Sequence, residues 1–106
     1  MKPVIIESPY AGNVKRNVAY AKECLNHSLS LNEAPLASHL LYTQDGILDD
    51  TIPEQRKQGL AAGLAWLPFA EEHIFYIDYG YSTGMLAALK IATEQGKKIV
   101  ERKIYK

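Results

Sequence analysis

Short apolar runs alternate along this chain with segments that carry a hydrophobic residue at every third or fourth position. Apolar runs are typical of buried β-strands, whereas spacing by three and four is typical of a helix with one buried face. The predicted strands are residues 3–7, 36–42, 73–77 and 98–105, and the predicted helices are residues 13–30, 53–67 and 84–95.

Residues that start or stop helices support these boundaries. Asn13 is a good cap for the first helix, residues 32–35 end it, and Pro53 suits the first turn of the second helix. Gly59 and Gly63 lie four residues apart on that helix and indicate close approach to a neighbouring element. The stripe expected to face the core in the first helix consists of Val14, Val18, Ala21, Leu25 and Leu29.

The order of the elements predicts the fold class. Strands and helices alternate as β-α-β-α-β-α-β, which favours right-handed crossovers and a parallel sheet. Residues 73–77 are uniformly apolar, so this strand is predicted to be central. We therefore predict one α/β domain over residues 1–106, with a small Rossmann-like parallel sheet of about four strands and helices on both faces.

Charge and composition narrow the classes of partner. Lysine and arginine together number 12, as do aspartate and glutamate, so the formal net charge is zero. A nucleic-acid polymer is therefore a poor candidate partner, whereas self-association meets no net repulsion, and Trp66 and Phe69 favour a homo-oligomer. No apolar stretch approaches the ~20 residues that span a bilayer, and the single Cys24 calls for no oxidising compartment. We expect a cytoplasmic protein without a membrane partner.

Ligands of open parallel sheets bind beyond the carboxyl ends of the strands. The most informative segment there follows residues 73–77, because an acid, glycines and hydroxyls precede a helix start, where exposed N–H groups attract anions. A helix cap with a tight turn uses the same residue types equally well. The candidate ligand-binding residues in this segment are Asp78, Tyr81, Ser82, Thr83, Gly84 and Met85.

Two further segments fall at the same edge of the predicted sheet. After the first strand, Tyr10 offers a stacking surface, and Ser8 and Glu7 offer polar groups. Arg16, in the next helix, could reach a phosphate, although a solvated arginine fits equally well. In the third segment, His39 is either a ligand-binding residue or a hydrogen-bonded core histidine. The histidines have no metal-ligand spacing, so neither a metal nor a cofactor is predicted.

The chain resembles the nucleoside 2-deoxyribosyltransferase superfamily in two short loops and in the order of its elements. Asp78, Gly84-Met85, Ala92 and Gly96-Lys97 carry one part of the resemblance, and residues 8–12 carry the other. Over nearly its full length the chain also resembles small uncharacterised phage and prophage proteins. Those proteins share the segments ESPYAG, ASHLLYTQ and D-x-G-x-S-x-GM.

The resemblance to the transferases implies a specific reaction but breaks at its nucleophile. In that family a glutamate directly after Gly-Met attacks the anomeric carbon, and an aspartate at the preceding strand end assists the base. The aspartate maps to Asp78, whereas the glutamate maps to Leu86, whose alkyl group cannot form a covalent intermediate. Glu7 and Asp78 are the remaining catalytic candidates, and we expect both to face one crevice.

These observations favour a phage-type protein that binds a nucleotide or nucleoside-like molecule without catalysis. Such a protein could sequester a nucleotide signal of host defence in the host cytoplasm. One alternative is a nucleoside or nucleotide N-glycosidase or 2-deoxyribosyltransferase that uses Glu7 and Asp78. A second alternative is a protein–protein interaction module without a small ligand.

Overall fold

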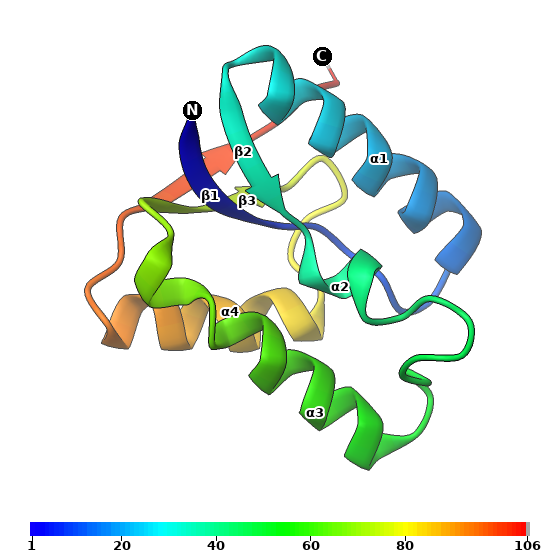
Figure 1. Ribbon diagram of the computed structural model, residues 1–106. Coiled ribbons are helices and arrows are strands. Elements are labelled where there is room, and N and C mark those ends of the chain that lie inside the picture. Colours follow the sequence, from blue (N-terminus) through cyan, green and yellow to red (C-terminus); the bar gives the residue numbers. More distant parts are fainter. Residues whose placement is uncertain (106) are drawn as a thin grey trace.

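A parallel four-stranded sheet forms the centre of the protein, as seen in a computed structural model that describes residues 1–105 (Figure 1). The strands are β1 (Lys2–Glu7), β2 (Glu33–Leu36), β3 (Glu72–Tyr76) and β4 (Ile99–Arg102), in the order β2-β1-β3-β4. All three pairings are parallel. The predicted Rossmann-like α/β fold is therefore confirmed, and β3 is central, as predicted, together with β1.

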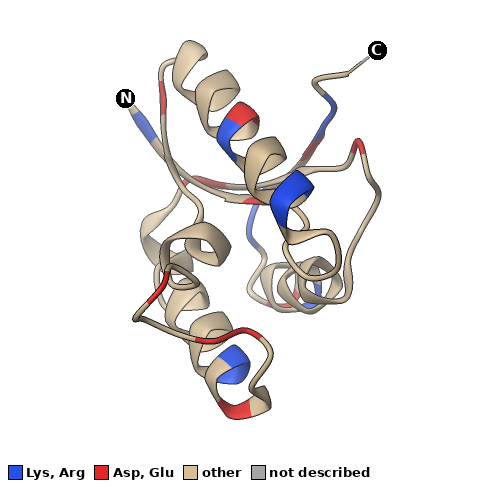
Figure 2. Ribbon diagram, turned by 90° about the vertical axis from the view of Figure 1, so that its right-hand side faces the viewer, with Lys and Arg blue, Asp and Glu red and all other residues tan. Residues whose placement is uncertain are grey.

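Helices cover both faces of this sheet. Helix α1 (Val14–Ser30) lies on one face, and α3 (Pro53–Leu64) and α4 (Thr83–Glu94) lie on the other (Figures 1 and 2). A short helix, α2 (Ser38–Leu41), follows β2, and a 3₁₀ turn, η1 (Leu67–Phe69), precedes β3. Lysines, arginines and acidic residues are interspersed along the elements, in keeping with the balanced charge (Figure 2).

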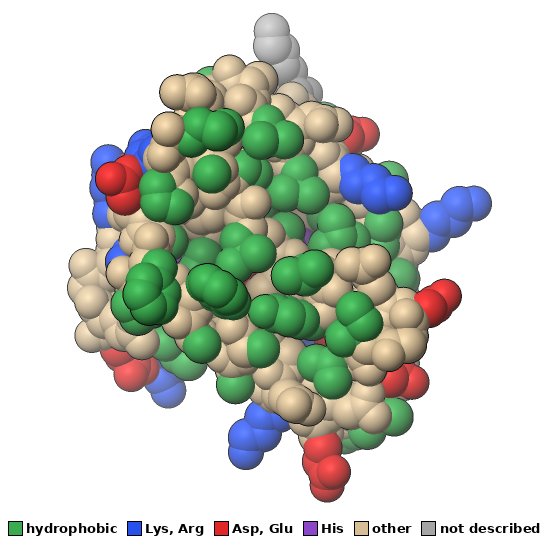
Figure 3. All heavy atoms as spheres, in the orientation of Figure 1, with side chains coloured by type: hydrophobic (Ala, Val, Ile, Leu, Met, Phe, Trp, Pro, Cys, Tyr) green, Lys and Arg blue, Asp and Glu red, His purple; other side chains and the backbone are tan. Residues whose placement is uncertain are grey.

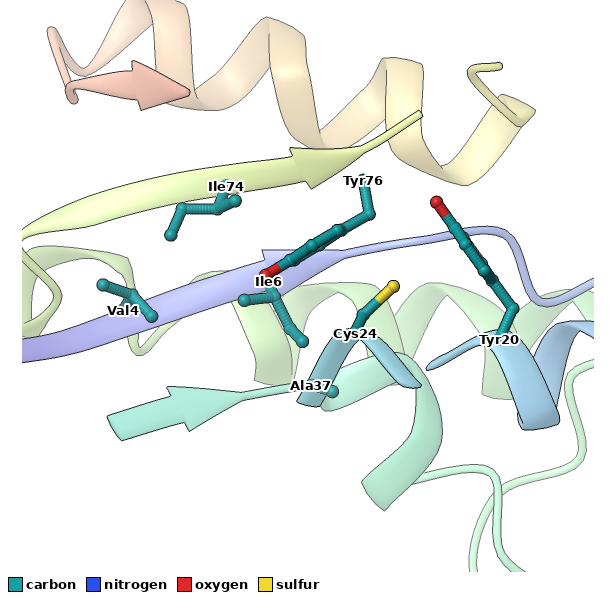
Figure 4. Packing of buried hydrophobic residues seen from close by; sticks show 7 residues of the cluster. All are labelled: Val4, Ile6, Tyr20, Cys24, Ala37, Ile74 and Tyr76. Atoms are coloured by element: carbon teal, nitrogen blue, oxygen red, sulfur yellow. The ribbon is translucent and has the colours of Figure 1, made fainter. Parts of the chain in front are cut away.

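The two central strands are buried on both faces because their side chains alternate between two apolar layers. Val4 and Ile6 of β1 join Ile74 and Tyr76 of β3 in the layer beneath α1, where Tyr20, Cys24 and Ala37 complete the cluster (Figure 4). Ile5 and Phe75 point to the opposite face, against residues of η1 and α4. This double burial explains why the middle of β1 and the second half of β3, residues 4–6 and 74–76, are apolar in the sequence.

The predicted strand at residues 36–42 is wrong in position. The strand is Glu33–Leu36, and residues 38–41 form α2. Residues 32–35 do end α1, with Asn32 in the left-handed region at φ 61°, but the strand begins at once after that turn. Pro35 argues against a strand in the sequence because proline lacks the N–H that donates a hydrogen bond to the neighbouring strand. Proline is tolerated mainly in edge strands, and β2 is at the edge of the sheet.

The predicted apolar stripe of α1 is displaced by about one position from its buried face. Val14 and Leu29 are exposed, and the side that meets the sheet consists of Asn17, Tyr20, Ala21, Cys24 and Ser28. Polar groups lie on the buried side because each has a hydrogen-bond partner there, such as Glu33 for Ser28. Asn13 caps the helix as predicted and accepts a hydrogen bond from the Arg16 N–H.

Two buried glutamates are held by cations. Glu33 accepts two hydrogen bonds from the Arg102 guanidinium, at 2.8 and 2.6 Å, and a third from Ser28 at 2.7 Å. Glu72 lies 2.9 Å from Lys2 Nζ and 2.7 Å from Lys98 Nζ. The hydrogen bonds from Arg102 lower the pKa of Glu33, and those from Lys98 and then Lys2 lower the pKa of Glu72.

The Glu33–Arg102 pair should make stability depend on acid. Because folding lowers the pKa of Glu33, its contribution is fully present above the ordinary value of 4.5 and is lost as the pH falls through the folded value. At neutral pH, Arg102→Met leaves a carboxylate buried without its main partner, and we expect a loss of about 3 kcal/mol in unfolding free energy. Urea titrations at neutral pH and near pH 3 measure both effects. If Arg102→Met lowered the unfolding free energy as much at pH 3 as at pH 7, the stabilising role of the ionised Glu33 would be contradicted.

Close approach at Gly63 is confirmed by the structure. A β-carbon there would lie 2.2 Å from Ser38 Oγ, so α2 and α3 meet at this glycine. At Gly59 the same addition would meet only the end of the Leu48 side chain, at 3.3 Å.

We therefore expect Gly63→Ala to lower the melting temperature, because overpacking costs about 1–3 kcal/mol and outweighs the gain in helix propensity of about 1 kcal/mol. Gly59→Ala is the matched control and should be neutral or stabilising, because the flexible Leu48 side chain can move. Thermal unfolding of both variants tests this, and equal melting temperatures would show that the contact does not constrain α3.

Candidate functional site

A cleft of about 750 Å³ opens beyond the carboxyl ends of β1 and β3. Its walls come from four places: the loop after β1, α2 with the residues that follow it, the first half of α3, and the start of α4. This is the position at which parallel sheets bind ligands. The residues that line the cleft and concern its chemistry are Glu7, Ser8, Tyr10, Ser38, His39, Tyr42, Asp50, Arg56, Lys57, Tyr81, Ser82, Thr83, Gly84 and Met85.

The loop after β1 is held in place by a side chain that the sequence analysis missed. Asn17 is buried and donates from Nδ2 to the carbonyl oxygens of Tyr10, at 2.9 Å, and Ala11, at 3.2 Å. Gly12 completes the turn with a φ of 97°, a conformation that favours glycine. Asn17 thereby fixes the wall that carries Ser8 and Tyr10.

Ser8 and His39 form a polar pair in this cleft. Ser8 Oγ is hydrogen-bonded to His39 Nε2 at 2.7 Å, while the buried Nδ1 of His39 has no partner among residues 1–105. Burial lowers the pKa of His39, and the nearby charge of Glu7 opposes that effect only in part. His39 is therefore a neutral imidazole near pH 7 that is hydrogen-bonded and lines the cleft, and its role in ligand binding stays a prediction.

Glu7 ends β1 and lines the cleft. Its side chain is 11% exposed, and His73 Nε2 lies 3.6 Å from its Oε1, which is too long for a hydrogen bond. Both ring nitrogens of His73 are buried without a hydrogen-bond partner within residues 1–105. Glu7 is thus a nearly buried acid whose accessible side faces the cleft.

The start of α4 forms the opposite wall. Ser82 caps the helix, with its Oγ accepting from the Met85 N–H at 3.2 Å, so the capping interpretation of this hydroxyl holds. The N–H groups of Thr83 and Gly84 belong to the first turn, which has no intrahelical acceptors for them. Tyr81 packs its ring on Phe75 and donates from its hydroxyl to Glu101; burial and that hydrogen bond raise its pKa to about 12.

Two cations of α3 belong to this site and were not predicted from the sequence. Arg56 and Lys57 line the cleft, and a β-carbon on Gly84 would lie 3.7 Å from Arg56 Nη2. Asp50 lies 3.3 Å from Arg56 Nη1 and holds the guanidinium at this wall. No local motif marks these cations, since only the packing of α3 beside α4 lets the Arg56 side chain reach Gly84.

Asp78 and Arg16 lie outside the cleft, which corrects the expectation that Glu7 and Asp78 share one crevice. Asp78 accepts hydrogen bonds from the Tyr20 hydroxyl, at 2.5 Å, and from the N–H groups of Ile104 and Tyr105. Burial raises the pKa of Asp78, but these donors outweigh it and the net shift is downward. They also draw residues 103–105 out of the sheet, so β4 is shorter than the predicted strand at 98–105. The Arg16 guanidinium stacks 4.0 Å from the Tyr79 ring centroid instead.

The other predicted site residues are brought together. Ser8, Tyr10 and His39 line one side of the cleft, and residues 81–85 line the other. Leu86, at the position of the transferase nucleophile, is 53% exposed and does not line the cleft.

Comparison with known proteins assigns the chain to a family. Residues 2–102 match the family described as Domain of unknown function (DUF7768). The chain belongs to this family. A search of curated proteins gives no significant match.

The DUF7768 match spans the complete cleft, from Glu7 to Met85. None of the helices described in residues 1–105 is both long and apolar enough to cross a membrane. Within the same residues, no group of three or more His, Cys, Asp or Glu side chains is arranged to hold a metal ion.

Proposed function

We propose that this protein binds a nucleotide and holds its phosphate between the start of α4 and Arg56. The observation that carries the proposal is the position of the Arg56 guanidinium, which lies against Gly84 in the first turn of α4 at the cleft wall. Unpaired N–H groups of a helix start and a guanidinium both favour an anion, and a glycine lets the anion approach the backbone. Lys57 adds a second positive charge to this wall.

The remainder of the cleft suits the uncharged part of such a ligand. Tyr10, Tyr42 and Tyr81 line it and offer aromatic surfaces on which a base can stack. The volume of about 750 Å³ falls in the range of small-molecule sites, which extends over roughly 300–1,000 Å³. A phosphate subsite beside aromatic walls is the arrangement that favours a nucleotide over a simple anion.

We propose binding without catalysis. The enzyme alternative, a glycosidase or deoxyribosyltransferase, relied on Glu7 and Asp78 in one crevice, yet Asp78 is committed to Tyr20 and to residues 104–105. The resemblance to phage proteins extends the proposal to a role: the protein would sequester a nucleotide signal of host defence. The interaction-module alternative predicts no small ligand at all, so ligand binding separates it from this proposal.

The phosphate subsite is tested by Arg56→Met with Lys90→Met as the control. Loss of a hydrogen bond to a charged group costs about 1.5–3 kcal/mol, so Arg56→Met should weaken binding of nucleoside monophosphates by roughly 10-fold or more. Lys90→Met also removes one positive charge, at an exposed position outside the cleft, and should leave binding unchanged. Calorimetric titration with monophosphates and with the parent nucleosides measures the difference. Equal weakening of nucleosides and monophosphates, or a larger effect at Lys90, would contradict the proposed subsite.

Incubation with nucleotides distinguishes a protein that only binds its ligand from an enzyme that cleaves it. A panel of ribo- and deoxyribonucleotides is incubated with the protein, the protein is denatured, and the supernatant is analysed by chromatography. Recovery of intact ligand supports the binding protein, whereas released base that depends on Glu7 would establish the enzyme alternative.

Self-association is a further proposal. Apolar side chains gather on the face over β2, α2 and α3 (Figure 3). Among the exposed residues Trp66 is 50% and Phe69 73% accessible, and their rings are in edge contact 6.3 Å apart. Aromatic residues of this kind are enriched in protein interfaces.

We therefore expect the wild-type protein to have at least twice its monomer mass in light scattering at micromolar concentration. Phe69→Lys should shift it toward the monomer, because the added charge would be buried in the interface. Lys57→Ala is the control: Lys57 lines the cleft and lies outside the Trp66–Phe69 pair, so its replacement should leave the mass unchanged. A wild-type protein that remains monomeric at every concentration would refute the proposal.

A further inference from the structure

Among residues 1–105, three glutamates are nearly buried, and one of these three accepts no hydrogen bond from the protein. Glu33 is held by Arg102 and Ser28, and Glu72 is held by Lys2 and Lys98. For Glu7 we find no hydrogen bond to the carboxylate among residues 1–105, and the nearest basic nitrogen is His73 Nε2 at 3.6 Å. Glu7 is 8% exposed as a residue, against 3% for Glu33 and 5% for Glu72.

A buried carboxylate without donors is costly, and native proteins pair nearly all such groups. The other two acids follow that rule with protein partners. Glu7 differs because it also lines the cleft. Within residues 1–105 its oxygens are not among the fully buried polar atoms without a partner, so water reaches them in the free protein. A ligand that fills the cleft displaces this water and binds well only if it supplies hydrogen-bond donors in its place.

The neighbours of Glu7 restrict what those donors can be. An ionised carboxylate accepts hydrogen bonds only, and it accepts two at once from a pair of adjacent donors. Ser8 and His39 are paired with each other beside it. Arg56 and Lys57 line the same cleft and are balanced there by Asp50 and by Glu7 itself. The donors that a nucleotide can offer to Glu7 are its neutral hydroxyl and N–H groups.

We propose that Glu7 determines ligand specificity by accepting two hydrogen bonds from a pair of adjacent neutral donors. In a nucleotide such a pair occurs in the vicinal hydroxyls of ribose and in the N1–H and N2–H groups of guanine. This inference rests on the proposed nucleotide site and concerns the sugar or the base of the ligand, not its phosphate. Glu7 has a recognition role in it, and no bond is made or broken.

Four probes separate the two sources of donors: the 5′-monophosphates AMP, dAMP, GMP and dGMP, titrated calorimetrically into the wild-type protein. If ribose supplies the donors, AMP and GMP bind at least about 10-fold more tightly than their deoxy forms, which corresponds to the loss of a charged hydrogen bond. If guanine supplies them, GMP and dGMP bind more tightly than AMP and dAMP by a similar factor.

Glu7→Gln then tests the residue itself. Glutamine keeps the shape but replaces one acceptor oxygen by a donor, so the preference should shrink to less than about 3-fold. Glu54→Gln makes the same change at an exposed position outside the cleft and should leave the preference intact. Thermal unfolding of both variants verifies that they are folded.

The outcomes distinguish this inference from the proposed function. Equal binding of all four monophosphates by the wild type, with the weakening by Arg56→Met retained, would overturn the role of Glu7 and leave the phosphate site standing. A preference that survives Glu7→Gln unchanged would also overturn it. No binding of any monophosphate would overturn both proposals, and this result needs only the wild-type protein.

Discussion

The parallel pairing of β1 with β3 is the constraint on which the rest of this structure depends. The register places Glu7 opposite Phe75, so both strands reach the same edge of the sheet within one or two residues. Their side chains are buried on both faces, which leaves no room for solvated polar groups along the strands except near their ends. The loops beyond those ends therefore collect the polar groups, and the helices α1 and α4 begin from them with their N-termini turned to one edge. The position of the cleft follows from this pairing.

Much of the fold was predictable because hydrophobic periodicity reports burial directly. The apolar runs at residues 3–7 and 73–77 belong to strands buried on both faces. Pro53 begins α3, and Gly96, at a φ of 67°, follows the end of α4, so both mark helix boundaries through backbone chemistry alone. The position of the second strand was predicted wrongly for two reasons. An edge strand is only partly buried, so its hydrophobic pattern is weak, and Pro35 resembles a residue that ends a helix. Its first residue, Glu33, is buried by an ion pair with Arg102, which lies 69 residues away, and no local pattern encodes that contact.

The site residues also fall into two groups: some were predictable from the local sequence, and others reach the cleft only through tertiary packing. Ser8, Tyr10 and residues 81–85 follow strand ends, so topology alone predicted where they lie. Arg56 and Lys57 reach the cleft only through the packing of α3 beside α4, and a sequence does not show which helices pack together. Asp78 illustrates the opposite error. An acid at a strand end is a reasonable ligand-binding candidate, yet the Tyr20 hydroxyl and two backbone N–H groups of the C-terminal segment already satisfy it.

Cys24 is a native probe for the opening of the longest helix, α1, away from the sheet. The thiol is completely buried between α1 and the sheet, and burial raises its pKa to about 12 (Figure 4). A thiol in that state reacts with alkylating reagents only when its surroundings open. Since it is the single cysteine of the chain, its alkylation rate counts the events in which α1 separates from β1 and β3. Helix α1 also carries Asn17, which holds the cleft loop, so one native sulfur atom reports how often the wall of the cleft loses its support.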